Sequence, residues 1–207
     1  AAVNDKLKLV NKFEMDAVWG NNAAYTSGDY GRIGADGVNI EVKNTYAEII
    51  GGGLWRVGTQ PNYLARGFLF DDDATSLLYL YPAETWSIAA VWLKAVEGGI
   101  GDDENKKDVD AFVIIPTFHF GEGMFKVAPY WLYQMSDNGA ALAGSQYRLQ
   151  SNAGGAVGAP LGEIGWHTFG LDLDVKLKAV DLWGTFIMQT GDAEIGAVNG
   201  PKVDFAG

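Results

Sequence analysis

Apolar and polar residues alternate with a period of two along most of the chain. In the segment 166–178, the even-numbered positions after Trp166 are polar or glycine and include Asp172 and Asp174. The odd-numbered positions after His167 are all apolar. Successive side chains of a β-strand point to opposite faces, so this pattern predicts a strand with one polar and one apolar face. The segment 6–19 follows the same pattern, with mostly charged residues on one face and mostly apolar residues on the other.

The alternation predicts nine strands and the start of a tenth, and no segment keeps a helical period. Several of these strands exceed the roughly five or six residues of a typical soluble strand, and they match the roughly 9–11 tilted residues that cross a bilayer. The predicted strands are 6–19, 37–50, 53–59, 75–81, 85–97, 109–120, 124–136, 166–178 and 181–190, with the tenth beginning near Val203.

The links between these strands alternate between short and long. Up-and-down barrels of the outer membrane have short periplasmic turns and long outer loops. We therefore predict an all-β fold, a transmembrane antiparallel up-and-down β-barrel, with residues 1–207 in a single domain. A soluble β-sandwich that acts as a binding module also produces alternating strands, and it is the alternative. The short links are 51–52, 82–84, 121–123 and 179–180, and the long links are 20–36, 60–74, 98–108, 137–165 and 191–202.

Composition agrees with a strand-rich chain and disfavours several classes of protein. Glycine is abundant at 28 residues, cysteine is absent, and the formal net charge of −11 disfavours nucleic acid as a partner. No apolar run approaches the roughly 18 residues of a transmembrane helix. No P-loop, zinc-protease or serine-hydrolase motif occurs, so we expect neither an enzyme nor a cofactor or metal site. We interpret His119 and His167 as structural residues.

Aromatic residues gather near the ends of the predicted strands. Outer-membrane barrels carry aromatic girdles at both membrane interfaces, where amphipathic rings are favoured. The alternative is that aromatic residues simply favour strands. The residues expected in the girdles are Trp19, Trp55, Trp86, Trp166, Tyr46 and Tyr133.

Three segments resemble a known family, the trimeric porins of sulfate- and metal-reducing bacteria. They are Phe13–Trp19 (FEMDAVW), Gly34–Tyr46 (GADGVNIEVKNTY) and Gly58–Ala74 (GTQPNYLARGFLFDDDA), and the strand Ser76–Tyr81 fits as well. The strand pattern resembles that of the family over most of the chain, and the similarity of the amino-acid sequence itself is confined to these segments. It implies a closed barrel in the bacterial outer membrane, passive diffusion of ions and small hydrophilic solutes, and a homotrimer in contact with outer-membrane lipid.

The number of strands departs from that family. Large porins have about 16–18 strands, whereas the alternation here gives nine and the beginning of another at Asp204–Gly207. We therefore expect the sequence to be part of a longer porin. The alternative is a small ten-stranded barrel with a very short last strand.

The link 60–74 is the strongest candidate for a functional site. It carries Arg66 and the acidic run Asp71, Asp72 and Asp73. If one hairpin precedes the chain, this link takes the place of the loop that folds into the lumen of large porins, and we predict that these four residues form a pore constriction. Selectivity depends on pore diameter and lining charge, so the acidic run should favour cations. The alternative is a solvated acidic loop on the outside.

The alternation of the strands also predicts residues of the pore wall. An acidic loop would face basic wall residues, and the opposed charges would set a field across the pore. Asp172 and Asp174 share a predicted face with Lys176 and Lys178, which suits a wet lumen better than acid–base catalysis. The predicted wall residues are Lys8, Lys12, Lys43, Arg56, Asp172 and Asp174.

Overall fold

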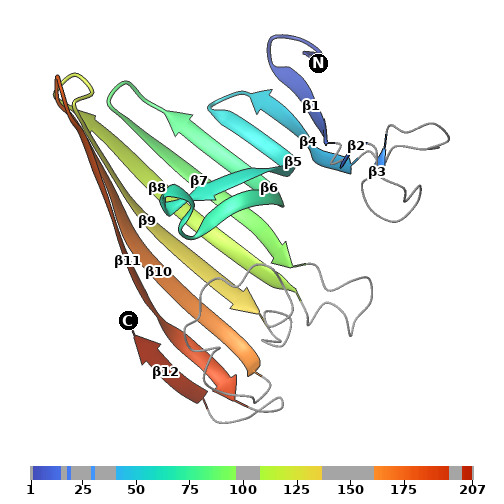
Figure 1. The fold of residues 1–207 in the computed structure, drawn as a ribbon, viewed down its shortest axis with the longest axis vertical. Helices are drawn as coiled ribbons and strands as arrows, with labels where there is room; N and C mark the ends of the chain where they lie inside the picture. The colour runs from blue at the N-terminus through green and yellow to red at the C-terminus, as the bar shows by residue number, and fades with distance from the viewer. Residues whose placement is uncertain are drawn as a thin grey trace.

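The computed structural model describes residues 2–14, 18–19, 29–30, 41–96, 108–136, 161–195 and 202–206. Ten strands of this part of the chain form one antiparallel sheet, in which each strand pairs with the next strand of the sheet along the chain (Figure 1). The strands are β1 (Leu7–Glu14), β4 (Glu41–Ile50), β5 (Leu54–Leu64), β6 (Phe70–Pro82), β7 (Trp86–Val96), β8 (Val109–Phe120), β9 (Phe125–Ser136), β10 (Leu161–Lys176), β11 (Asp181–Ile195) and β12 (Lys202–Ala206).

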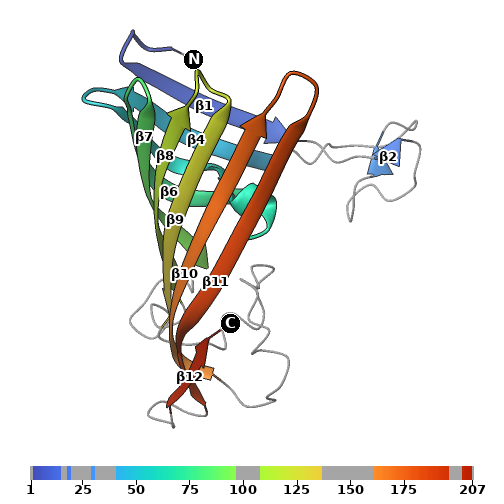
Figure 2. The same ribbon diagram turned by 90° about the vertical axis from the view of Figure 1, so that its left-hand side faces the viewer.

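The predicted all-β, up-and-down arrangement is confirmed. The described residues contain no α-helix, and none of their helical segments is long and apolar enough to cross a membrane. The sheet is curved, with β1 at one edge and β12 at the other, and in the described residues these two strands do not pair with each other (Figure 2). The structure therefore shows an open curved sheet and not a closed barrel.

Tight turns connect the strands where the short links were predicted. Gly52 at the β4–β5 turn and Gly121 at the β8–β9 turn have φ angles of 63° and 61°. This left-handed region suits glycine because it has no Cβ to clash with the backbone. The long links 20–36, 98–108 and 137–165 lie almost wholly outside the described residues.

The first predicted strand, 6–19, is too long. β1 ends at Glu14, after a register shift between Lys12 and Phe13 that marks a bulge in its pairing with β4. The extra residue of the bulge is Lys43 on β4, and a bulge bends and twists the strand that carries it. Val18–Trp19 (β2) belongs instead to a small parallel pair with Asp29–Tyr30 (β3).

The predicted link 60–74 is wrong as a secondary-structure assignment. β5 continues to Leu64 and β6 starts at Phe70, and the two strands pair throughout, closed by the single 3-10 turn η1 (Ala65–Gly67). The alternation rule missed this hairpin because its polar residues, such as Asn62 and Asp71, stand on both of its faces. A strand buried on one side shows a two-residue pattern, whereas a hairpin that leaves the sheet has no such constraint.

The two faces of the sheet differ in exposure. We call the face crossed by the β5–β6 hairpin the inner face and the opposite one the outer face. The inner face holds the buried cluster, including Leu93, Val113 and Leu132, together with buried polar residues such as Gln134 and Thr168. The outer face carries large apolar side chains that remain exposed, among them Phe112, Ile114, Phe118, Phe125, Phe169, Leu173, Phe186 and Met188.

Candidate functional site

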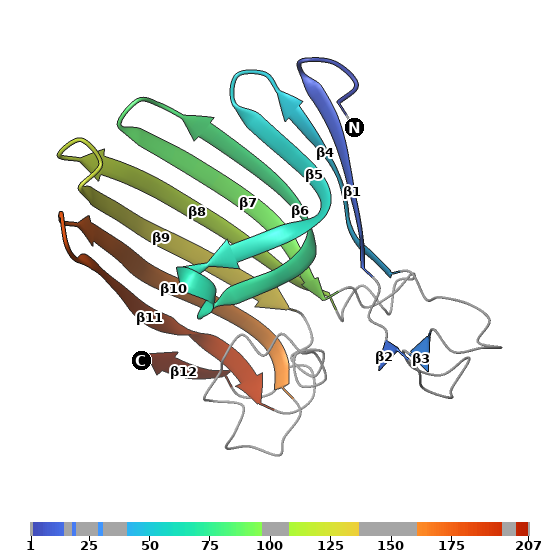
Figure 3. The ribbon, with the colours of Figure 1, turned by 45° about the horizontal axis from the view of Figure 1, so that its top comes forward.

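The candidate site centres on the part of the β5–β6 hairpin that leaves the sheet, residues 60–74, which we call the arm. β5 pairs with β4 only as far as Thr59, and β6 pairs with β7 only from Thr75 onward. Beyond these two positions, the described strands of the hairpin pair only with each other. The arm crosses the inner face of the sheet and reaches strands far along it (Figure 3). The structure thus places the predicted constriction segment over the inner face, as a hairpin and not as an irregular loop.

The tip of the arm is a tight turn held by apolar packing. Ala65, Arg66 and Gly67 all have left-handed φ angles, of 54°, 56° and 85°. For a residue with a side chain this conformation costs about 1–2 kcal/mol. Burial offsets that cost, because Leu64, Ala65 and Phe70 are 5%, 2% and 6% exposed and belong to the buried cluster of the inner face. The tip is therefore seated on the sheet through its buried apolar side chains.

Arg66 fastens the tip to the far side of the sheet. Its Nη2 donates to the Asp174 carboxylate at 2.7 Å and to the Leu173 carbonyl at 3.1 Å, and its guanidinium lies 5.1 Å from the centre of the Trp183 ring. Asp174 and Trp183 face each other on β10 and β11. Lys126 on β9 approaches the other oxygen of Asp174 at 3.4 Å. Two cations thus share one carboxylate beneath the tip.

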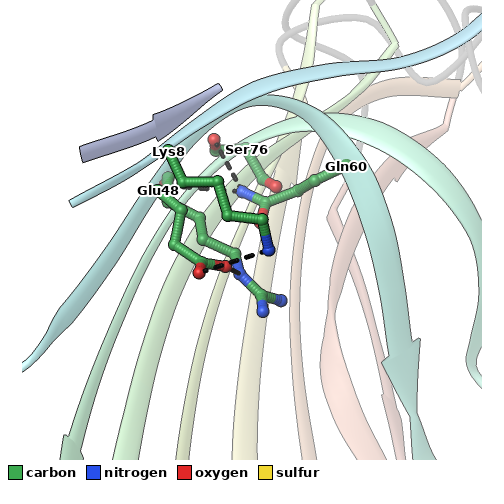
Figure 4. A network of polar contacts seen from close by, with 5 residues as sticks. Lys8, Glu48, Gln60 and Ser76 are labelled. Carbon is green, nitrogen blue, oxygen red and sulfur yellow. Dashed lines mark hydrogen bonds and ion pairs between the residues drawn. The ribbon is translucent and has the colours of Figure 1, made fainter. Parts of the chain in front are cut away.

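Polar contacts hold the base of the arm on the near side. Asn44 on β4 donates through Nδ2 to the Asp73 carboxylate at 2.6 Å. Gln60, which is fully buried, donates through Nε2 to the Ser76 carbonyl at 3.1 Å (Figure 4). The arm is consequently fixed at both ends, by Asn44 and Ser76 near its base and by Asp174 and Trp183 at its tip.

The near wall of the inner face is lined by a charged row on three neighbouring strands. Glu48 on β4 lies between Lys8 on β1 and Arg56 on β5, with nitrogen-to-oxygen distances of 3.8 Å and 2.9 Å (Figure 4). The Arg56 guanidinium also lies 5.6 Å from the centre of the Tyr46 ring. Since one acid here meets two bases, this row carries a net positive charge.

The structure brings most of the predicted wall residues to the inner face. Lys8, Lys12 and Arg56 lie there on the near side, and Asp172 and Asp174 lie there on the far side, where Asp172 accepts a hydrogen bond from Thr185 at 2.7 Å. Lys43 falls at the bulge between β1 and β4 and pairs with Glu14 at 2.7 Å.

The observed charge contacts differ from the expected meeting of acidic loop and basic wall. Lys8 and Arg56 are bridged by Glu48, whereas the tip of the arm meets an acidic wall through its one arginine. Asp71 and Asp72 are exposed along the arm, and Asp73 contacts Asn44. The exposed carboxylates of Asp71 and Asp72 therefore line the space beside the arm.

Sequence reasoning missed the partners that position the arm. Glu48, Asn44 and Trp183 carry no local motif, and their roles depend on which strands pair and in which register. Lys126 falls on a face of mixed character in β9, so the alternation gave no reason to single it out. Charge complementarity between alternate positions of successive strands was the one available signal for Glu48.

The expected aromatic girdle is only partly on the outer face. Trp55, Trp86 and Tyr133 lie there by strand alternation. Trp166 is instead buried on the inner face, and Tyr46 lies there beneath Arg56, so these two expectations are wrong. The side chain of Trp19 lies outside the described residues.

Comparisons with known protein families, with curated proteins and with solved structures found no match to this chain.

Proposed function

We propose that this chain is part of an outer-membrane porin that lets ions and small hydrophilic solutes diffuse passively. In this proposal the outer face contacts outer-membrane lipid, the inner face lines the pore, and the arm forms its constriction. The barrel would work as a homotrimer in the bacterial outer membrane. It would need no cofactor, catalyse no reaction and bind no nucleic acid.

The exposed apolar outer face is the observation that carries the proposal. Phe112, Ile114, Phe186 and Met188 are 37%, 40%, 62% and 43% exposed, and they belong to a surface that continues across several strands. Soluble monomers rarely expose apolar patches of more than a few hundred Å². A membrane barrel, in contrast, exposes an apolar outer surface because that surface contacts lipid. The alternate positions of its strands face the lumen and are polar.

A soluble β-sandwich would cover the same apolar face with a second sheet. The described residues form one large sheet and a pair of two-residue strands, so no second layer of comparable size is present among them. Strand length also favours a membrane, because β8 and β9 have 12 residues each. This exceeds the roughly 9–11 residues that a tilted strand needs to cross a bilayer.

The full-length protein is expected to form pores when it is added from detergent to a planar bilayer. Stepwise increases in current should appear, and the same preparation should migrate faster on a gel before heating than after it. Membrane barrels retain their structure in detergent until they are heated, which is the basis of the gel test. A protein that stays monodisperse without detergent and gives no current steps would defeat the proposal.

Replacing Asp71, Asp72 and Asp73 together with asparagine is expected to reduce the preference of the pore for cations. Asp71 and Asp72 are exposed along the arm, and carboxylates that line a pore attract cations and repel anions. The reversal potential under a salt gradient measures this preference. As a matched control, Glu84 is exposed in the turn between β6 and β7, outside the arm, and its change to glutamine should leave the potential near the wild-type value. An unchanged potential in the triple variant would contradict the role of the arm.

A further inference from the structure

A groove of about 490 Å³ lies in the middle of the outer face. Its floor is Ala90 on β7, whose neighbours across the sheet are Tyr79 on β6 and Ile114 on β8. The next positions in the same row are Trp55 and Trp131. Because Ala90 contributes only a methyl group to a row of large side chains, the surface above it is recessed by about the length of one side chain.

Hydrogen bonds hold the aromatic walls of the groove in place. The Tyr79 hydroxyl donates to the Gly52 carbonyl at 2.7 Å, and its ring lies 4.4 Å from that of Trp55, measured between ring centres. Trp92 donates from Nε1 to Asp110 at 2.9 Å, and Trp131 donates from Nε1 to His167 Nδ1 at 3.2 Å. The groove is thus preformed, which lowers the entropic cost of filling it.

The chemistry of the groove favours a hydrocarbon chain as its occupant. The polar atoms of Tyr79, Trp92 and Trp131 are hydrogen-bonded within the chain, and the exposed lining of the groove is almost wholly apolar. A protein partner is usually recognised by a polar rim around an apolar centre. Here exposed Val57 and Phe118 extend the apolar surface beyond the groove.

We infer that this groove binds one acyl chain of a membrane phospholipid at a fixed position on the outer face. The inference rests on the proposed function, which places this face in lipid. Burying apolar groups against a preformed apolar surface provides the binding free energy, and no charged or polar contact to a headgroup is required. The bound lipid would differ from its neighbours by remaining attached when the surrounding lipid is exchanged for detergent.

Filling the groove tests this inference. The full chain is reconstituted in phosphatidylethanolamine vesicles, extracted in mild detergent and analysed by native mass spectrometry. We expect one phospholipid to remain on the wild type, and its occupancy to fall at least about tenfold in Ala90→Trp, a loss of about 1.4 kcal/mol in binding. Ala90→Leu fills the groove with a smaller side chain and should show the same loss if Ala90→Trp does not fold.

Ala47→Trp is the matched control, because Ala47 lies on the outer face but outside the groove, between Leu9 and Val57. It should retain the lipid as the wild type does. Equal lipid retention by all variants would overturn the inference. It would also be overturned if copies of the wild-type chain stay associated in detergent and the Ala90→Trp substitution makes them dissociate, because the groove would then join copies of the chain. Conductance is measured separately, and we expect Ala90→Trp to keep the wild-type conductance. Absence of current in every protein would contradict the proposed pore function, whereas the lipid measurement alone decides whether the groove binds an acyl chain.

Discussion

Replacing Arg66 with methionine is expected to loosen the tip of the arm by about 2 kcal/mol, the usual contribution of hydrogen bonds to a charged group. Arg66 donates to Asp174 and to the Leu173 carbonyl, and it stacks on Trp183. Methionine keeps the length and apolar character of the side chain but removes every donor. A change of this size lowers the ratio of seated to released arms about 30-fold.

The released arm should appear as a second conductance level in single-channel recordings. Leu64, Ala65 and Phe70 still pack on the inner face in the variant, so the arm should return to its seat and the current should switch between two levels. In the proposed pore, the larger level would correspond to the state in which the arm no longer narrows the lumen. Because the tip of the seated arm lies beside Asp174 on β10, a cross-link between the arm and β10 should prevent release and abolish the larger level.

Lys126→Gln separates this positional effect from the effect of charge. Lys126 touches the same carboxylate as Arg66, but it belongs to β9 and not to the arm. Both variants remove one positive charge beside Asp174, so both should shift ion preference towards cations. Only Arg66→Met should add a second level. If the two variants give the same single level, Arg66 contributes charge alone and does not hold the arm.

The sequence predicted most strands because their two faces meet different surroundings. β8 and β9 were predicted within one residue of their observed bounds. β9 carries large apolar residues on its outer face and mixed residues on its inner face, whereas β8 is apolar on both faces and was delimited by the polar link before it and the glycine turn after it. The predicted glycine turn at 121–123 marked where β8 ends and β9 begins, as the turn at 51–52 did for β4 and β5. The arm broke this rule, because a hairpin outside the sheet has no fixed apolar side.

The arrangement of the candidate site was not predictable from local pattern. Arg66 and Asp174 were both singled out, but nothing in the sequence indicated that they pair, because their contact depends on the bend of the arm and the curvature of the sheet. Lys8, Glu48 and Arg56 align only once the registers of β1, β4 and β5 are known. Register is set by turns and packing along whole strands and not by the charged residues themselves.

Gly58 lies on β5 just before the arm, one residue before the pairing with β4 ends, and it is the position most sensitive to substitution. Its φ angle is +126°, a region nearly closed to residues with a side chain, and a Cβ there would lie 2.3 Å from the Thr45 carbonyl oxygen. Backbone strain of this kind costs about 1–3 kcal/mol. The Thr45 oxygen belongs to the β4 backbone, so the clash is relieved only by separating the two strands.

Gly58→Ala is therefore expected to destabilise the folded protein by about 3 kcal/mol or more, through strain and loss of β4–β5 pairing together. Urea unfolding in detergent micelles, followed by tryptophan fluorescence, measures the change in the free energy of unfolding. Gly184→Ala is the matched control, because a Cβ added to this strand glycine would have nothing within 4 Å and its φ angle is not positive. It should change stability by less than about 0.5 kcal/mol, as surface substitutions usually do. Similar stability of both variants would show that the bend at Gly58 does not depend on glycine, and the direction of the arm would then depend on the contacts at its base and its tip.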